Sequence, residues 1–186
     1  MKHKYIAVIS LAAILVAVTS VALARAGNSK PTTTLVETVR QATASFQDVK
    51  AAQAAGYALL HGCVSGQQDG AMGIHFANGD LVGDGIVDAQ DPEALLYEQK
   101  GGTLRLVGAE FVVLADAWNA KNQMPPVLMG QLFNYVSTPN RYGLPAFYEL
   151  HVWSGKSNPA GAFADWNTRV SCEEFVGEHA SHGAGH

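Results

Sequence analysis

Two apolar stretches that carry polar side chains constrain this chain of 186 residues more than any other feature. One is Met72–Asn78, which reads Met-Gly-Ile-His-Phe-Ala-Asn, and the other is Phe147–Trp153, which reads Phe-Tyr-Glu-Leu-His-Val-Trp. Both have the length and residue types of buried strands. Because side chains alternate between the two faces of a strand, Glu149 and His151 point to one face and Leu150 to the other. The sequence therefore predicts polar groups inside a sheet.

Polar groups in such strands indicate a metal site. A buried imidazole or carboxylate costs free energy unless it is hydrogen-bonded, paired with a charge or bound to a metal. We predict that His75, Glu149 and His151 bind a transition metal ion, with His61 or Glu98 as a fourth ligand. Two imidazoles and a carboxylate suit zinc, copper, iron or manganese.

The alternative interpretation is that the histidines are structural. In that case His75 and His151 form hydrogen bonds with the backbone or with Glu149 and Glu110. The protein is then a metal-free domain that binds a small ligand or another protein, and a cleft among its aromatic side chains is the candidate ligand site.

An Asp- and Gly-rich segment over residues 78–92 resembles part of a calcium-binding loop. Asp80, Asp84 and Asp91 match positions one, five and twelve of such a loop, whose oxygen ligands hold Ca²⁺. Position three is Val82, which has no side-chain oxygen. The alternative is a solvated turn of Asp and Gly residues.

The amino terminus has the composition of a secretory signal peptide. Residues 1–4 include two lysines, residues 5–23 are apolar, and residues 24–26 (Ala-Arg-Ala) fit a cleavage pattern. We predict a signal peptide over residues 1–26, a linker over residues 27–33, and export to the periplasm or the exterior of a bacterial cell. An uncleaved membrane anchor is the alternative.

The net charge argues against two classes of partner. The chain has 12 Lys or Arg and 16 Asp or Glu, and cleavage after residue 26 leaves nine basic residues and a formal charge of −7. An acidic chain is a poor partner for nucleic acid and for anionic membranes. We expect a metal ion or a small ligand as the partner, and no stable membrane association after cleavage.

The two cysteines are Cys63 and Cys172. In an exported chain an even number of cysteines is typical of disulfides. This disulfide would close a loop of about 110 residues and stabilise the fold by roughly 4–5 kcal/mol. Paired thiolate ligands are the alternative, but they lack the short spacing of structural zinc sites.

Periodicity predicts one helix followed by strands. Thr34 and Glu37 have capping-box spacing, and apolar residues at steps of three and four extend the helical pattern to Ala55, before Gly56. Short strand-like segments then alternate with turns. The expected fold is α+β, with the N-terminal amphipathic helix packed on an antiparallel sheet or small barrel and one disulfide.

Length and composition predict one domain and a tail. About 160 residues suit a single core, which we place over residues 34–176. Residues 177–186 lose the apolar pattern and are predicted to be a disordered tail. Its His179, His182 and His186 can hold metal ions loosely, or they occur there by chance.

Five short segments and a closing cysteine occur in a characteristic order. They are residues 73–76 (Gly-Ile-His-Phe), 92–98 (Pro-Glu-Ala-Leu-Leu-Tyr-Glu), 106–111 (Leu-Val-Gly-Ala-Glu-Phe), 150–153 (Leu-His-Val-Trp), 158–163 (Asn-Pro-Ala-Gly-Ala-Phe) and Cys172. In this order they resemble an uncharacterised family of small exported bacterial proteins, although Thr168 stands where members often have Pro. The resemblance implies export and one compact domain, and it implies no chemistry.

The sequence assigns no catalytic residue. Ser65 lacks the G-x-S-x-G context of a hydrolase nucleophile, and both cysteines belong to the predicted disulfide. The sequence also has no phosphate-binding glycine loop, no H-E-x-x-H motif and no covalent-haem motif. Whether the protein is an enzyme is left open.

Overall fold

The computed structural model describes residues 33–66, 68–177 and 179–181. The predicted signal peptide, and the predicted linker apart from Thr33, lie outside these residues. Among the residues described, no helix combines the length and the apolar composition that a membrane span requires.

Helical elements come first along the described chain, and most of the elements that follow are strands. In chain order the elements are α1 (Leu35–Ala42), the 3-10 helix η1 (Ala44–Gln47), α2 (Val49–Ala54), β1 (Ala58–Ser65), β2 (Ala71–Ala77), α3 (Gly79–Asp84), β3 (Ala94–Lys100), β4 (Thr103–Leu114), α4 (Ala115–Asn119), β5 (Val127–Leu128), β6 (Gln131–Leu132), β7 (Asn134–Val136), β8 (Phe147–Val152) and β9 (His179–Ser181).

The N-terminal helical segment is interrupted, whereas the sequence predicts one continuous helix. Thr34 caps α1 by accepting a hydrogen bond from the backbone N–H of Glu37 (3.2 Å), as the capping-box spacing predicts. α1 ends at Ala42, and the hydroxyl of the cap residue Thr43 donates to the carbonyl of Val39 (2.8 Å). The carboxylate of Asp48 then caps α2. Polar side chains that bond the local backbone therefore divide the predicted helix.

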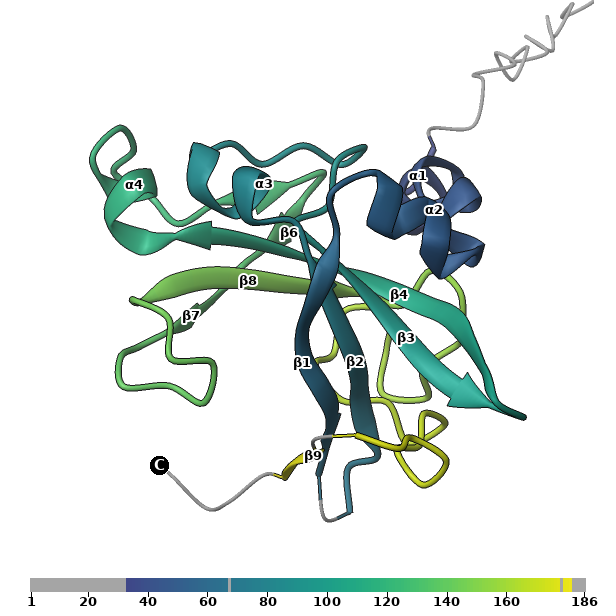
Figure 1. Ribbon diagram of the computed structural model, residues 1–186. Coiled ribbons are helices and arrows are strands. Elements are labelled where there is room, and N and C mark those ends of the chain that lie inside the picture. Colours follow the sequence, from purple (N-terminus) through teal and green to yellow (C-terminus); the bar gives the residue numbers. More distant parts are fainter. Residues whose placement is uncertain (1–32, 67, 178, 182–186) are drawn as a thin grey trace, which may run out of the picture. The chain divides into compact units, whose positions relative to one another are not determined.

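A curled, mainly antiparallel sheet carries the core of the described unit (Figure 1). Its strand order is β7-β8-β4-β3-β2-β1-β9, and each neighbouring pair is antiparallel except β1 and β9. The strands curl into a half-barrel, and α1, η1 and α2 contact β4 or β8. The predicted α+β class, with helical structure packed on an antiparallel sheet, is confirmed.

The register of the sheet gathers the candidate polar side chains on one face, where they lie among apolar ones, because residues paired across neighbouring strands point to the same face. On one face the paired rows carry large core side chains, namely Ile74, Phe76, Leu95, Tyr97, Phe111 and Leu150. The hydroxyl of Tyr97 donates to the carbonyl of Phe46 in η1 (2.6 Å), so helical residues lie against this face. On the other face the rows include His61, His75, Ala94, Glu110, Glu149 and His151.

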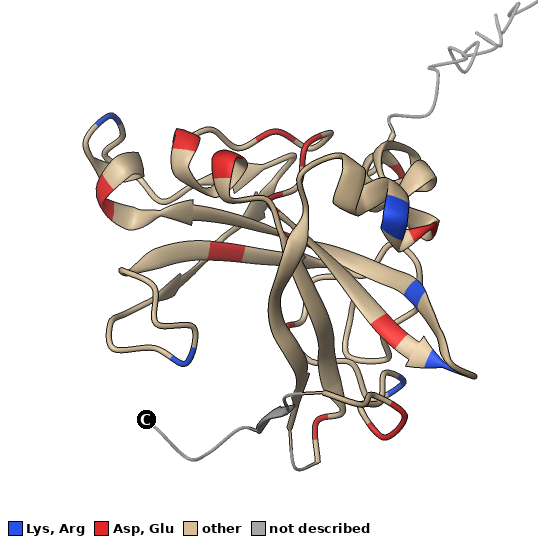
Figure 2. Cartoon of the chain, viewed as in Figure 1, with Lys and Arg blue, Asp and Glu red and all other residues tan. Residues whose placement is uncertain are grey.

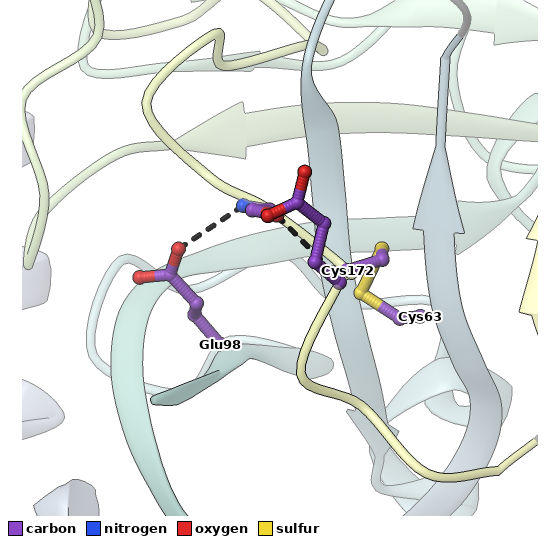
Figure 3. The surroundings of a disulfide bond; sticks show 5 residues. Cys63, Glu98 and Cys172 are labelled. Carbon is purple, nitrogen blue, oxygen red and sulfur yellow. Dashed lines mark hydrogen bonds between the residues drawn. A yellow bond between two sulfur atoms is a disulfide. The ribbon is translucent and has the colours of Figure 1, made fainter. Parts of the chain in front are cut away.

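The predicted disulfide joins Cys63 on β1 to Cys172 (Figure 3). The two cysteines are 109 residues apart in the sequence, and both are buried. The bond therefore fixes the C-terminal segment of the described chain to the first strand.

The segment predicted to be a disordered tail contains a short strand. His179–Ser181 form β9, which pairs in parallel with residues 63–65 of β1. Pairing of this kind uses backbone groups on an open sheet edge and needs no apolar side chains, so composition did not predict it. Residues 178 and 182–186, including His182 and His186, lie outside the described residues.

Candidate metal centre

Three strands bring two histidines and a carboxylate together on the polar face of the sheet. They are His75 on β2, Glu110 on β4 and His151 on β8, and one ligand atom from each lies within 4.8 Å of the other two. Glu110 and His151 are direct partners in the register of β4 and β8, so their side chains start from neighbouring points. Two of the predicted ligands, His75 and His151, thus meet in one group.

His75 and Glu110 meet diagonally across the strand that lies between theirs. β3 separates β2 from β4, and in its register Leu96 pairs with His75 whereas Ala94 pairs with Glu110. His75 Nε2 lies 3.5 Å from Glu110 Oε2, across the width of a strand.

The ring nitrogens of the two histidines are buried without hydrogen-bond partners. His75 is 2% exposed and His151 is 0% exposed. Among the residues described, neither Nδ1 nor Nε2 of either ring has a partner. An unsatisfied buried polar group costs about 1–3 kcal/mol, and an ion that accepts the nitrogen lone pairs removes that cost.

Electrostatics keep His75 in the form that binds metal. Burial, followed by the nearby His151 and His61, lowers the pKa of His75 to about 3. The ring is therefore neutral at neutral pH and has a lone pair available for a ligand bond.

Two carboxyl groups of the centre resist ionisation in the absence of a cation. Burial, and then the carboxylate of Glu149, raise the pKa of Glu110 well above its ordinary value. Burial likewise raises the pKa of Glu149. A cation placed between them would favour the ionised form of both.

Glu149 belongs to a second group of possible ligands, with His151 and Asp165. Asp165 comes from the loop after β8, and its Oδ1 lies 3.6 Å from His151 Nδ1. Glu149 Oε2 is buried without a hydrogen-bond partner. The predicted set of His75, Glu149 and His151 is therefore divided between two adjacent groups that share His151.

His61, a predicted fourth ligand, lies beside the centre. It pairs with His75 in the register of β1 and β2, and its Nε2 is buried without a partner. The ring of Tyr142 packs against both, with centroid distances of 5.3 Å to His61 and 6.2 Å to His75. His61 is a member of neither ligand group.

Glu98, the other predicted fourth ligand, has a structural role elsewhere. Its carboxylate forms an ion pair with Lys156 and accepts a hydrogen bond from the backbone N–H of Ser171 (3.0 Å). It lies near the Cys63–Cys172 disulfide (Figure 3). Because its oxygens are engaged there, Glu98 is not positioned to complete the centre.

The Asp-rich segment forms the helix α3 in place of the predicted calcium loop. Asn78 caps α3 by accepting a hydrogen bond from the Asp80 backbone N–H (3.1 Å), and Asp84 accepts one from that of Ile86 (2.7 Å). Figure 2 shows the acidic residues that α3 carries. The ligand groups found among the described residues do not include Asp80, Asp84 or Asp91.

Sequence reasoning missed Glu110 and Asp165 as candidate ligands. The alternation of β4 could have placed Glu110 on one face, but nothing in the sequence aligned it with His151. Asp165 follows the Asn158–Phe163 segment in a loop, where no periodicity gives its direction.

A small cavity adjoins the centre. Its volume is about 30 Å³, and both His75 and Glu110 line it. Its other walls are mostly apolar, so the centre has one side that faces a small, mainly apolar space.

Comparison of the chain with family models, with curated proteins and with solved structures found no match. The resemblance to an uncharacterised exported family stays a prediction, and function is argued from the site alone. The described residues contain buried groups of His, Glu and Asp that could hold a metal ion.

Proposed function

We propose that this protein binds a divalent transition metal ion through His75, Glu110 and His151. The observation that supports this most is the set of unpartnered, buried ring nitrogens beside a buried carboxylate. Two imidazoles and a carboxylate suit zinc with an open position, or iron or manganese, and imidazole also suits copper.

Glu149 is the next ligand in this proposal. It forms a ligand group with His151 and Asp165, and its Oε2 is buried without a hydrogen-bond partner. Two ionised carboxylates balance the charge of one divalent cation. The ion would thus favour the ionised form that burial disfavours in both carboxyl groups.

The metal-free alternative gives the histidines only weak partners, among them the backbone of Gly73 beside His75. It requires His75 and His151 to form hydrogen bonds with the backbone or with Glu149 and Glu110. The contact between His75 Nε2 and Glu110 Oε2 is 3.5 Å long, and neither His75 nitrogen meets hydrogen-bond geometry. Structural histidines of the usual kind are satisfied, so the metal proposal accounts better for this site.

Export to an oxidising compartment is the second part of the proposal. The disulfide between Cys63 and Cys172 supports it, because such bonds persist outside the reducing cytosol. The predicted signal peptide over residues 1–26 is the segment that would direct it.

Elemental analysis of tag-free protein, purified without added metal or chelator, tests the metal proposal. We expect about one zinc, copper, iron or manganese ion per chain. His75→Ala should reduce this content to near zero, because it removes a ligand from a three-donor group. Removal of residues 182–186 is the control, since it deletes His182 and His186 and should leave the metal content unchanged.

Thermal unfolding separates loss of metal from loss of fold. We expect the metal-loaded wild-type protein to melt at a higher temperature than the same protein stripped by a chelator, because the ion binds the folded state alone. A wild-type protein that stays folded, holds no metal and gains no thermal stability on titration with these ions would contradict the proposal and favour the metal-free alternative.

A further inference from the structure

The cavity beside the metal centre is too small for most ligands. Its volume of about 30 Å³ compares with about 10–15 Å³ that one water molecule needs by the same measure. An occupant is therefore limited to about two or three non-hydrogen atoms. His75 and Glu110 both line it, so an ion held between them has one side toward the cavity.

The cavity walls are mainly apolar. Strands β1 to β4, helix α3, the segment before β8 and the first residue of β8 contribute them, including Val82, Val112 and Leu144. Tyr142 is the other polar residue on the wall, apart from the two ligands. A charged molecule would lose its hydration on entry without an equivalent replacement, and the cavity therefore favours uncharged occupants.

We infer that this cavity admits a small uncharged molecule, of the size of nitric oxide or dioxygen, to an open coordination position of the metal. The inference rests on the proposed metal centre. It adds the class of small molecule that would bind the metal there. His75, Glu110 and His151 leave a position free on a tetrahedral sphere. If Glu149 also binds, four protein donors leave a position free on a five- or six-coordinate sphere. The cavity is the space next to His75 and Glu110 where that position can be filled.

Protein loaded with Co²⁺ tests the inference, because the visible absorption of this ion changes when its coordination changes. Nitric oxide, added without oxygen, and imidazole are the two probes. Above about pH 8 both are uncharged. Both bind metal ions, but imidazole is a ring of five non-hydrogen atoms. We expect nitric oxide to change the absorption of the wild-type protein and imidazole at the same concentration to leave it unchanged.

Leu144 provides a matched pair of variants. It lines the cavity, is partly exposed and belongs to neither ligand group. Leu144→Trp should fill the cavity and weaken nitric oxide binding about tenfold or more. Leu144→Ala should enlarge the cavity and allow imidazole to bind. Both variants should keep about one cobalt ion per chain.

Cobalt content distinguishes failure of the inference from failure of the metal proposal. If all three proteins hold cobalt, equal binding of nitric oxide by the wild type and Leu144→Trp overturns the inference. Imidazole binding to the wild type as tight as that of nitric oxide overturns it as well. A wild-type protein that binds no cobalt contradicts the metal centre first and removes the basis of the inference with it.

Discussion

At the residue scale, Glu93 is a buried carboxyl group that belongs to neither ligand group. It is 2% exposed, and its Oε2 accepts a hydrogen bond from the backbone N–H of Val112 (3.0 Å). Burial, with smaller contributions from Asp84 and Asp91, raises its pKa to about 8. Between its ordinary pKa and this value, the folded protein holds a proton that the unfolded chain has lost. The free energy of unfolding therefore falls as the pH rises across this window.

Glu93→Gln should make the protein less sensitive to alkaline pH. The amide oxygen still accepts from Val112 but cannot ionise, so the decrease in the free energy of unfolding between pH 5 and pH 8 should be shallower by up to about 1.4 kcal/mol per pH unit. Urea unfolding at a series of pH values measures this slope. The exposed Glu173→Gln is the control, and an identical slope in wild type and Glu93→Gln would show that Glu93 is ionised in the folded state.

Single residues were predictable where a strand pattern surrounded them. His75 and His151 stood out because apolar neighbours on both sides predicted burial. Glu110 lies in an equally apolar strand, yet its role depends on being opposite His151, and that pairing is set by strands far apart in sequence. Glu98 was misassigned for the same reason, because only the fold reveals Lys156 as its partner.

Gly73 gives β2 a backbone conformation that other residues rarely adopt. Its φ is +98°, and a Cβ atom added there would lie 2.7 Å from the backbone oxygen of Tyr97 on β3. The close approach of β2 to β3 at this point precedes His75 by two residues. The glycine therefore helps to set where the His75 side chain starts.

Gly73→Ala should destabilise the protein by about 1–3 kcal/mol, because the strained φ and the contact with Tyr97 both oppose it. Gly83→Ala on α3 is the control. Nothing lies within 4 Å of its added Cβ, and alanine should stabilise that helix by up to about 1 kcal/mol. Urea unfolding compares the two, and equal stability of Gly73→Ala and wild type would contradict the prediction.

Helices and strands were predictable from the sequence where periodicity was strong, but their first and last residues were less predictable. The strands predicted over residues 72–78 and 147–153 agree with β2 and β8 to within one residue at each end. α3 was predicted as a loop, because its Gly and Asp residues have low helix propensity and its cap at Asn78 was not recognised.

At the scale of the whole molecule, the disulfide joins the first strand of the chain to the segment that follows β8. Cys63 lies on the first strand, and Cys172 follows the last strand of the antiparallel series. The fold class and this bond were predictable, because composition and compartment imply them. The strand order β7-β8-β4-β3-β2-β1 was not, because β8 pairs with β4 across a gap that contains α4, β5, β6 and β7.

Replacement of both cysteines by alanine should reduce the free energy of unfolding by roughly 4–5 kcal/mol, because the unfolded chain loses a constraint that spans more than 100 residues. Urea unfolding of this variant and of the wild type measures the loss. Wild-type protein kept reduced by a thiol is the control and should show a similar decrease. A loss below about 1 kcal/mol in both would mean that the bond adds little to stability.

The origin of the ligands on three separate strands has a consequence for how the sheet assembles. His75, Glu110 and His151 face one another only when β2, β4 and β8 are all correctly aligned. A slip of one residue in any of these strands turns its ligand to the opposite face of the sheet. An ion at the centre would therefore stabilise the native pairing and none of the slipped ones. Metal binding would thus favour chains whose strands pair in the native register over chains whose strands are misaligned.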